Sequence, residues 1–497
     1  MATLSEHIDA GFGAVERMLS PRIVWLALAG GVLVFQVFLI WNHKPWADEL
    51  QALMIALEAP NQATLLAWLR YEGHPPLWYW LLRTIGSFAE PHIVLPLAAT
   101  LCAAIAQGAI LFTSPFSRLE RLLLASSQYL LFEFLTISRG TSLGVAVVVL
   151  ALVAWRSRWF WLLLAVLPLV DFLFGVISGV FLLLKWRERD LWWPGILLWL
   201  IASAFAAWTV IPPPDMVNAI DAMQPLHGID LLLHNLRGWF LKLGSIPLPF
   251  PGGLMAEWKA PVVPIASYAW ILLLALCWYC TKQRPWHRLM IFGFLGFTLA
   301  FNLAVYSIGL RHMLLVALLL IALVWLARAA GDKPGTAFRV WIFFASLCGI
   351  ASSLISTERG FSNGDAVLTQ IEARGLSERT WLAIPEWRVP AISGRSSLSF
   401  VRPEEGCRFR FVRWDHKSLA LENQSNFTAM LRHAVENYGQ SYMLSDRKFA
   451  GFDPDLLTEL VRIPPGYDGI TYYLYVVGPQ APEKQNDLPW CYAQVTN

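Results

Sequence analysis

Two acidic residues, Asp48 and Glu49, stand side by side directly after the first long apolar segment of the chain. Apolar residues follow at helical spacing and predict an amphipathic helix lying along a membrane surface: Leu50, Leu53, Met54 and Leu57. A carboxylate at the start of this helix could take the proton of an attacking hydroxyl, or orient that hydroxyl. In a structural interpretation, Asp48 and Gln51 cap the helix while Glu49 favours the helix dipole. The two interpretations are compatible, because a cap fixes a carboxylate in place.

A stiff turn with the sequence Gly73-His74-Pro75-Pro76-Leu77 comes next, and its prolines cannot continue a helix. Three aromatic residues follow the turn, Trp78, Tyr79 and Trp80. Their simplest role is in an aromatic belt at the membrane interface, although Tyr79 could also stack on a sugar or a lipid head group. For His74 the structural interpretation is an interfacial histidine that belongs to the turn.

Cationic side chains occur near the ends of two apolar segments. Arg139 lies in the sequence EFLTISRGTS, and Arg311 and His312 lie in YSIGLRHMLL. Charges in such segments are costly and usually functional. Arginine can hold a lipid phosphate by paired hydrogen bonds and stabilise it as a leaving group. The alternative is a buried ion pair, for example between Arg139 and Glu133, and Asp171 is expected to be a turn residue.

The composition is that of a polytopic membrane protein. Hydrophobic residues make up 56% of the 497 residues and charged residues 15%, against about 25% charged in soluble proteins. The 25 tryptophans suit interfacial belts. A net charge of +3 without long basic runs gives no indication of nucleic-acid binding. Cys277 and Cys280 form a CxxC in an apolar helix end, which favours packing over redox chemistry.

About eleven apolar segments are expected to span the membrane, near residues 23–40, 93–113, 121–137, 140–155, 159–171, 172–185, 191–211, 263–281, 288–307, 308–327 and 338–355. Lysine and arginine concentrate in alternate loops: Arg118, Arg121, Arg156, Arg158, Lys185, Arg187, Arg189, Lys282, Arg284, Arg288, Arg328, Lys333 and Arg339. Basic loops face the cytoplasm. The N-terminus is therefore predicted inside, with loops 42–91 and 212–262 and everything after about 356 outside.

The second outer loop, 212–262, is predicted to contain another helix lying on the outer surface, Ile229 to Leu243. From Ser356 the apolar runs shorten, and residues 356–497 are predicted to form a small soluble α/β domain. Its expected strands are 380–384, 397–401, 409–414, 441–444 and 470–477, and its expected helices are 365–374, 426–437 and 453–460. Cys407 and Cys491 could pair there in an oxidising compartment.

The acidic pair in the first outer loop, followed by the His-Pro-Pro-Leu turn and an aromatic helix, resembles the GT-C membrane glycosyltransferases. The nearest branch is the group of protein mannosyltransferases, aminoarabinose transferases and galacturonosyltransferases, a family 39-like set. The Tyr-x-x-Gly-x-Arg-His stretch that ends in Arg311 and His312 resembles a late-helix motif of the bacterial branch. The resemblance covers roughly residues 20–355 and is best over 41–82.

This resemblance implies a GT-C-like fold for residues 1–355, with Asp48 and Glu49 as catalytic carboxylates. It implies that His74 lines the cavity and binds phosphate, acceptor or metal. The cofactor expectation is none certain, with a divalent metal as an option that Asp48, Glu49 and His74 would hold. A recognisable sugar-binding repeat domain, as in protein mannosyltransferases, is missing from the sequence, which favours a glycan or lipid acceptor over protein.

The predicted function is transfer of a sugar from a polyprenyl-phosphate carrier to an acceptor hydroxyl, with inversion, at the periplasmic face of a bacterial inner membrane. The alternatives are a transporter or flippase for a lipid-linked glycan and a non-catalytic assembly subunit. The sequence contains no P-loop, HExxH or Gly-x-Ser-x-Gly motif, which argues against nucleotide-driven transport and serine chemistry.

Overall fold

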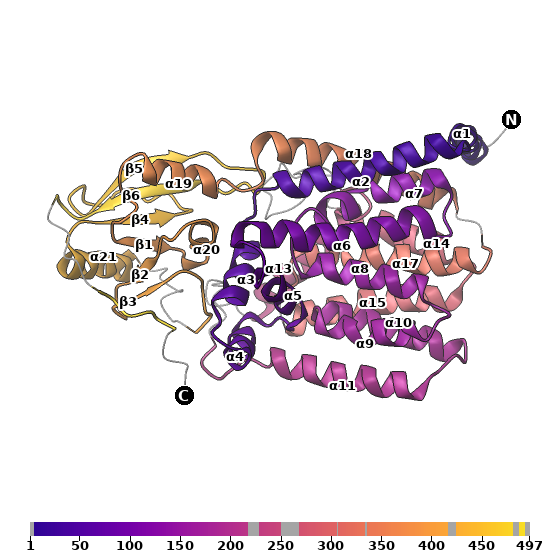
Figure 1. The fold of residues 1–497 in the computed structure, drawn as a ribbon, viewed down its shortest axis with the longest axis horizontal. Helices are drawn as coiled ribbons and strands as arrows, with labels where there is room; N and C mark the ends of the chain where they lie inside the picture. Colours follow the sequence, from indigo (N-terminus) through magenta and orange to yellow (C-terminus); the bar gives the residue numbers. More distant parts are fainter. Residues whose placement is uncertain are drawn as a thin grey trace.

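A bundle of long helices and a smaller region with two β-sheets make up the molecule (Figure 1). The computed structural model describes residues 4–216, 228–249, 268–305, 307–332, 335–415, 424–480 and 487–492. Much of the predicted outer loop 212–262, the start of the predicted span 263–281 and Lys333 therefore lie outside the described residues. The predicted class, a polytopic α-helical protein with a C-terminal sheet domain, is confirmed.

Six helical segments among the described residues are long and apolar enough to cross a membrane: Arg22–Asn42, Pro91–Thr113, Trp193–Val210, Pro285–Ala304, Leu310–Ala329 and Thr336–Glu372. Three shorter apolar helices accompany them, Gly140–Val153, Trp159–Leu169 and Trp270–Thr281. The six long segments correspond, in the same order, to α2, α6, α11, α15, α16 with α17, and α18 with α19. The three shorter ones correspond to α8, α9 with the 3-10 turn after it, and α14 (Figure 1). The expected number of about eleven spans stays a prediction.

The predicted apolar segment 121–137 is divided between two different helices, and whether it spans the membrane stays a prediction. Helix α7, Arg118–Ala125, ends at Ser126, and a π-helix follows at Gln128–Phe134. The Ser127 hydroxyl accepts a hydrogen bond from the Leu130 amide at 3.3 Å, which caps the second helix and separates it from the first. The wider π-turns then lead into an irregular segment that carries Arg139.

Three short helices close the end of the bundle that faces the sheets (Figure 1). They are α3, Ala47–Glu58; α4, Gln62–Glu72; and α5, Leu77–Gly86. Asn61 caps α4 by accepting from the Thr64 amide at 2.8 Å, and Gly73, in the left-handed conformation at φ 66°, ends it. The helix predicted after Asp48 is present as α3, and every residue from Leu50 to Ala56 is buried between the bundle and the C-terminal region, not only the apolar stripe. Its position along a membrane surface stays a prediction.

Helix α13, Gly228–Gly244, lies where a second outer helix was predicted. Its Trp239 is 5% exposed and donates through Nε1 to Thr298 Oγ1 on α15 at 3.3 Å. Lys242 donates to the carbonyl oxygen of Ile308 at 2.6 Å, directly before the segment that carries Arg311. The helix therefore supports that segment as well as packing on the bundle.

Beyond α18, which ends at Arg359, the chain forms a four-stranded sheet of order β1-β4-β6-β5. The strands are β1, Trp381–Ile384; β4, Ser441–Ser445; β6, Tyr472–Val477; and β5, Leu457–Ile463. Strands β1 and β4 are parallel, and the other pairs are antiparallel. A separate hairpin joins β2, Phe400–Arg402, to β3, Cys407–Phe409. The surrounding helices are α19, Gly364–Glu372; α20, Pro390–Ser393; and α21, Gln424–Tyr438.

Two secondary-structure predictions in this region are wrong. Residues 453–460 were expected to be helical, but from Leu457 the chain is strand β5, because it pairs with β6 through a bulge at Glu459 and Val461. The predicted strand 409–414 is strand only up to Phe409, and the chain then turns toward α3. A disulfide joins Cys407 to Cys491, which lie 84 residues apart in the sequence.

Candidate active site

Asp48 lies between two arginines that come from distant parts of the chain. It is the second residue of α3, Arg139 directly precedes α8 and Arg311 lies in α16. Asp48 Oδ2 is 2.7 Å from Arg139 Nη1 and 3.2 Å from Arg311 Nη2. The Arg311 guanidinium also lies 4.2 Å from the ring centre of Trp46. The folded chain thus unites three of the residues that the sequence singled out.

The environment keeps Asp48 ionised. Burial raises its pKa, but the charges of Arg139 and Arg311 outweigh burial, and the pKa lies below its usual value. Arg388, from the C-terminal region, lowers it further. Forty-five per cent of the Asp48 side chain is nevertheless exposed, so solvent or a ligand can reach it. Arg139 and Arg311 thus present two guanidinium groups beside a carboxylate that a ligand can reach.

The two oxygens of Asp48 are used unequally. Both arginines donate to Oδ2, and Oδ1 accepts no hydrogen bond from the described part of the chain. Oδ1 can therefore accept a bond from a ligand hydroxyl without displacing an arginine. From the sequence, the alternative to phosphate binding was a buried ion pair of Arg139 with Glu133. In the structure Arg139 forms its ion pair with Asp48. Glu133 accepts a hydrogen bond from Gln128 Nε2 at 3.2 Å.

Glu49 is fully buried and both of its oxygens carry bonds. Oε2 lies 2.9 Å from His43 Nε2 and accepts from the Trp46 amide at 3.0 Å, while Oε1 accepts from the Ser138 amide at 2.6 Å. Burial raises the pKa of Glu49, but His43 and the two amides lower it below its usual value. Because Ser138 directly precedes Arg139, Glu49 holds the arginine segment against α3.

The helix cap differs from the predicted one. Trp46 precedes the first turn of α3, and its amide donates to Glu49 rather than to Asp48. The proposed cap pair of Asp48 with Gln51 is therefore wrong, since Gln51 bonds elsewhere. Because Glu49 accepts the hydrogen bond that caps the helix, Asp48 remains available for a ligand.

His74, Tyr79 and His312 gather around the same cluster. His74 Nδ1 is buried and has no hydrogen-bond partner in the described part of the chain. Burial lowers the pKa of His74, against an opposing effect of Asp171. Tyr79 is 4% exposed, so it is not the exposed belt residue that was expected. The charges of Asp171 and Arg139 act on all three side chains, which places every predicted site residue at one end of the bundle.

Glu72 belongs to this cluster and was missed from the sequence. It is the last residue of α4, and its Oε1 accepts from Gln51 Nε2 at 2.9 Å and from Trp414 Nε1 at 3.1 Å. Burial, together with the charge of Asp48, raises the pKa of Glu72 to about 7. A glutamate at a helix end is ordinary in a sequence, and the adjacency to the His74 turn was the only available signal.

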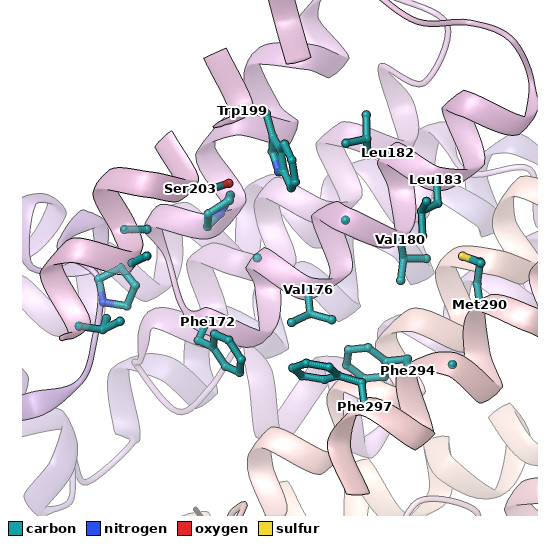
Figure 2. A pocket seen from close by; sticks show the side chains of 18 of the residues that line it. Phe172, Val176, Val180, Leu182, Leu183, Trp199, Ser203, Met290, Phe294 and Phe297 are labelled. Carbon is teal, nitrogen blue, oxygen red and sulfur yellow. The ribbon is translucent and has the colours of Figure 1, made fainter. Parts of the chain in front are cut away.

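An apolar cavity of about 630 Å³ lies within the bundle beside this end (Figure 2). Helices α10 (Phe172–Arg187), α11 and α15 form its walls, and Pro75 from the His74 turn reaches its lining. Figure 2 shows Phe172, Phe294 and Phe297 on one side and Trp199 with Ser203 on another. Its chemistry suits a hydrocarbon chain whose polar end lies near His74.

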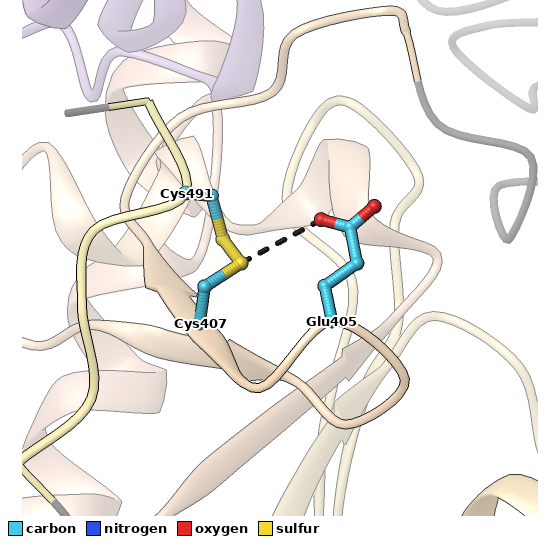
Figure 3. Close-up of side chains that lie close together, drawn as sticks. All are labelled: Glu405, Cys407 and Cys491. Carbon is cyan, nitrogen blue, oxygen red and sulfur yellow. Dashed lines mark hydrogen bonds between the residues drawn. A yellow bond between two sulfur atoms is a disulfide. The ribbon is translucent and has the colours of Figure 1, made fainter. Parts of the chain in front are cut away.

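The divalent metal that Asp48, Glu49 and His74 would hold stays a prediction, and the two arginines oppose it. Asp48 Oδ2 already pairs with two guanidinium groups, and both oxygens of Glu49 are bonded in a closed environment. A divalent cation bound at Asp48 would lie beside these arginines and be repelled by them. Elsewhere in the described residues, Glu405, Cys407 and Cys491 come close together (Figure 3), but the two sulfurs form a disulfide and cannot bind metal as thiolates.

Comparison with known proteins returns two solved structures. ArnT from Cupriavidus metallidurans bound to undecaprenyl phosphate is 13% identical, with 92% of this chain and 99% of that chain covered at a TM-score of 0.48. The apo state of ArnT is 13% identical, with 95% and 100% covered at a TM-score of 0.49. ArnT is an aminoarabinose transferase, from one of the groups that the sequence motifs resemble. No protein-family model and no curated protein matches the sequence.

Proposed function

We propose that this protein is a glycosyltransferase that moves a sugar from a polyprenyl-phosphate carrier to an acceptor hydroxyl at the outer face of a bacterial inner membrane. The observation that carries this proposal is the half-exposed, ionised Asp48 held between Arg139 and Arg311. A carboxylate that can orient a hydroxyl and two cations that can hold a phosphate are the groups that such a transfer needs.

The donor is proposed to bind with its phosphate near the two arginines and its hydrocarbon chain in the apolar cavity beside Pro75. Arg139 and Arg311 supply charge-assisted hydrogen bonds to the phosphate oxygens, sharing them with Asp48. His74 directly precedes Pro75 of the cavity lining, and its buried Nδ1, which has no partner in the described part of the chain, provides a further polar group for the donor.

In the proposed reaction the acceptor hydroxyl donates a hydrogen bond to Asp48 Oδ1. Its oxygen forms a bond to the anomeric carbon while the bond from that carbon to the phosphate oxygen breaks. The electron pair leaves with the phosphate, whose growing charge Arg139 and Arg311 stabilise, and the hydroxyl proton passes to Asp48. Attack opposite the leaving group inverts the anomeric centre.

Because the arginines lower the pKa of Asp48, this carboxylate is a weak base toward a free hydroxyl. Its main contribution is to orient the hydroxyl, whose proton becomes acidic only as the new bond forms. Glu49 acts one step away, by fixing the Arg139 segment through the Ser138 amide.

The experiment is a transfer assay with purified protein in detergent. The substrates are a radiolabelled polyprenyl-phosphate sugar and the glycolipid fraction of a strain that lacks this protein. Label should appear in the glycolipid with wild-type protein. Unlabelled glycolipid, together with movement of the labelled carrier across proteoliposomes, would overturn the proposal in favour of a flippase.

A further inference from the structure

Gln51, a glutamine of α3, bonds to the C-terminal region beside the candidate site. Gln51 Nε2 donates to the Val412 carbonyl oxygen at 2.6 Å, and Gln51 Oε1 accepts from the Val412 amide at 3.0 Å. The same Gln51 Nε2 donates to Glu72 at 2.9 Å. Because Gln51 is three residues after Asp48, these bonds place the Val412 segment within one helical turn of the candidate catalytic carboxylate.

Two tryptophans of the C-terminal region lie at this contact. Trp414 bonds to Glu72, and its ring packs nearly parallel to that of Trp387, with ring centres 6.3 Å apart at 22°. Both rings pack on buried Val412 and remain partly exposed. The residue after Trp387 is Arg388, whose charge acts on Asp48, so the pair lies on the side of the C-terminal region nearest the acid.

The bonding of Glu72 leaves capacity for a ligand. Both of its donors, Gln51 and Trp414, bond to Oε1, and in the described part of the chain Oε2 accepts no bond. An amide oxygen at this position would satisfy both donors without the cost of a partly buried charge. The two local hydrogen bonds therefore do not require a carboxylate at this position. The second oxygen of Glu72, Oε2, is available to accept a hydrogen bond from a ligand.

We propose that Glu72, Trp387 and Trp414 form the acceptor subsite and bind a sugar ring, which makes the acceptor a glycan or glycolipid. The apolar C–H face of the ring packs on the tryptophans, while one of its hydroxyls donates to Glu72 Oε2. A neighbouring hydroxyl of the same acceptor then reaches Asp48. The C-terminal region thereby selects the acceptor, while the bundle binds the donor.

This inference rests on the proposed function for its biological meaning, but a binding measurement tests it separately. The probe is the glycolipid fraction from a strain that lacks this protein, because that fraction carries the unmodified acceptor. Binding to detergent-solubilised protein is followed by tryptophan fluorescence, and acceptor KM and donor KM are measured in the transfer assay.

Glu72→Gln keeps an oxygen for both local donors, so the variant should fold. It should weaken acceptor binding and raise acceptor KM about tenfold or more, the worth of a hydrogen bond to a charged group, with donor KM unchanged. Trp387→Ala should weaken acceptor binding similarly. Trp414→Phe keeps a ring but removes the bond to Glu72, and should weaken binding less than Trp387→Ala.

Glu58→Gln is the matched control, because Glu58 also joins α3 to the C-terminal region, through Arg410 at 2.9 Å. It should leave acceptor binding unchanged. If Glu72→Gln and Trp387→Ala both bind the glycolipid as tightly as the wild-type protein does, the proposed acceptor subsite is wrong. Failure of the wild type to transfer any sugar, with glycolipid binding still dependent on Glu72, would instead overturn the proposed function.

Discussion

The two ends of the bundle each hold one carboxylate between two arginines, and the two clusters differ in what they leave open. At the end away from the sheets, Glu120 pairs with Arg328 at 2.8 Å through Oε2 and with Arg339 at 2.9 Å through Oε1. The Ser117 amide adds a bond to Oε2, and the Glu120 side chain is 0% exposed. Every oxygen is occupied, as in a cluster that holds helices together.

At the opposite end Asp48 has the same partners by type but concentrates them on one oxygen. Its side chain is 45% exposed, and Oδ1 carries none of the bonds from the described residues. The comparison teaches that the types of residue do not separate a structural ion cluster from a candidate active site. What distinguishes the two clusters is that Asp48 has an oxygen without a hydrogen bond from the described residues and is open to solvent, whereas Glu120 is enclosed with both oxygens bonded.

A topology reporter should distinguish the two ends of the bundle in an all-or-none way. Since the basic residues gather at the Glu120 end, that end should be cytoplasmic. A reporter that is active only in the periplasm should be fully active when fused after Gly360 and silent when fused after Arg189. The reverse pattern would place Asp48 in the cytoplasm and remove access to a periplasmic donor.

Asp48→Asn should lower turnover by roughly 10²–10⁴, the usual worth of a positioned acid–base group. The variant should lose less stability than Glu120→Gln, because the Asp48 side chain is 45% exposed, the Glu120 side chain is 0% exposed, and Glu49 still supplies the helix-terminal bond. Transfer rates and thermal unfolding are measured on the same purified sample. Glu49→Gln provides the contrast, with a lower melting temperature expected; full transfer activity in Asp48→Asn would contradict the assignment.

Glu120→Gln should show the opposite pattern, with stability lost and turnover of the folded protein retained. Removing a buried carboxylate leaves two arginines without compensation, at a cost of about 3 kcal/mol. Denaturant unfolding in detergent measures this loss. Donor KM is the control, and an unchanged unfolding midpoint would show that the closed cluster has no structural role.

Arg139→Ala and Arg311→Ala should each weaken donor binding about tenfold or more, since a hydrogen bond from a charged group is worth roughly 1.5–3 kcal/mol. The affinity for a polyprenyl-phosphate sugar is measured directly in detergent. Arg328→Ala, at the other end, should leave this affinity unaltered. Wild-type donor affinity in both site variants would leave the two arginines as partners of Asp48 only.

The smallest expected effect is a pH dependence at Glu72. The unfolded carboxyl has its ordinary pKa of 4.5, and the folded pKa is raised to about 7. Above pH 7 the group is ionised in both states and its burial costs stability, whereas below about pH 4.5 it is protonated in both and the cost disappears. Glu72→Gln should therefore raise the melting temperature at pH 8 and change it little at pH 5. Equal shifts at the two pH values would contradict the raised pKa.

The sequence predicted the membrane helices and the members of the candidate site better than their contacts. Hydropathy and the motif around Asp48 depend on local residue types, and both could be read directly. The bonding of Asp48 to Arg311 joins segments 263 positions apart, and no periodicity encodes it. The same reason explains why the complete burial of α3 was not predicted, since the region that covers it lies some 350 residues later.

Glu72 shows this limit most clearly. Its partner Trp414 follows β3, in a stretch that was predicted to be strand throughout. Residues 409–414 are of types that favour strands. The backbone of Val412, however, bonds to the Gln51 side chain instead of to a neighbouring strand. A partly buried carboxylate could be found only once these two regions were in contact.

The position of Tyr492 gives the disulfide a consequence for the timing of biosynthesis. Its hydroxyl accepts from the Arg413 amide at 3.0 Å, and its neighbour Cys491 is bonded to Cys407. The segment that carries Trp414 is thus held from both sides by residues that the ribosome adds long after the membrane helices. If Trp414 belongs to the acceptor subsite proposed above, a newly inserted chain would bind acceptor fully only after this disulfide has formed, which would make thiol oxidation the last step before activity.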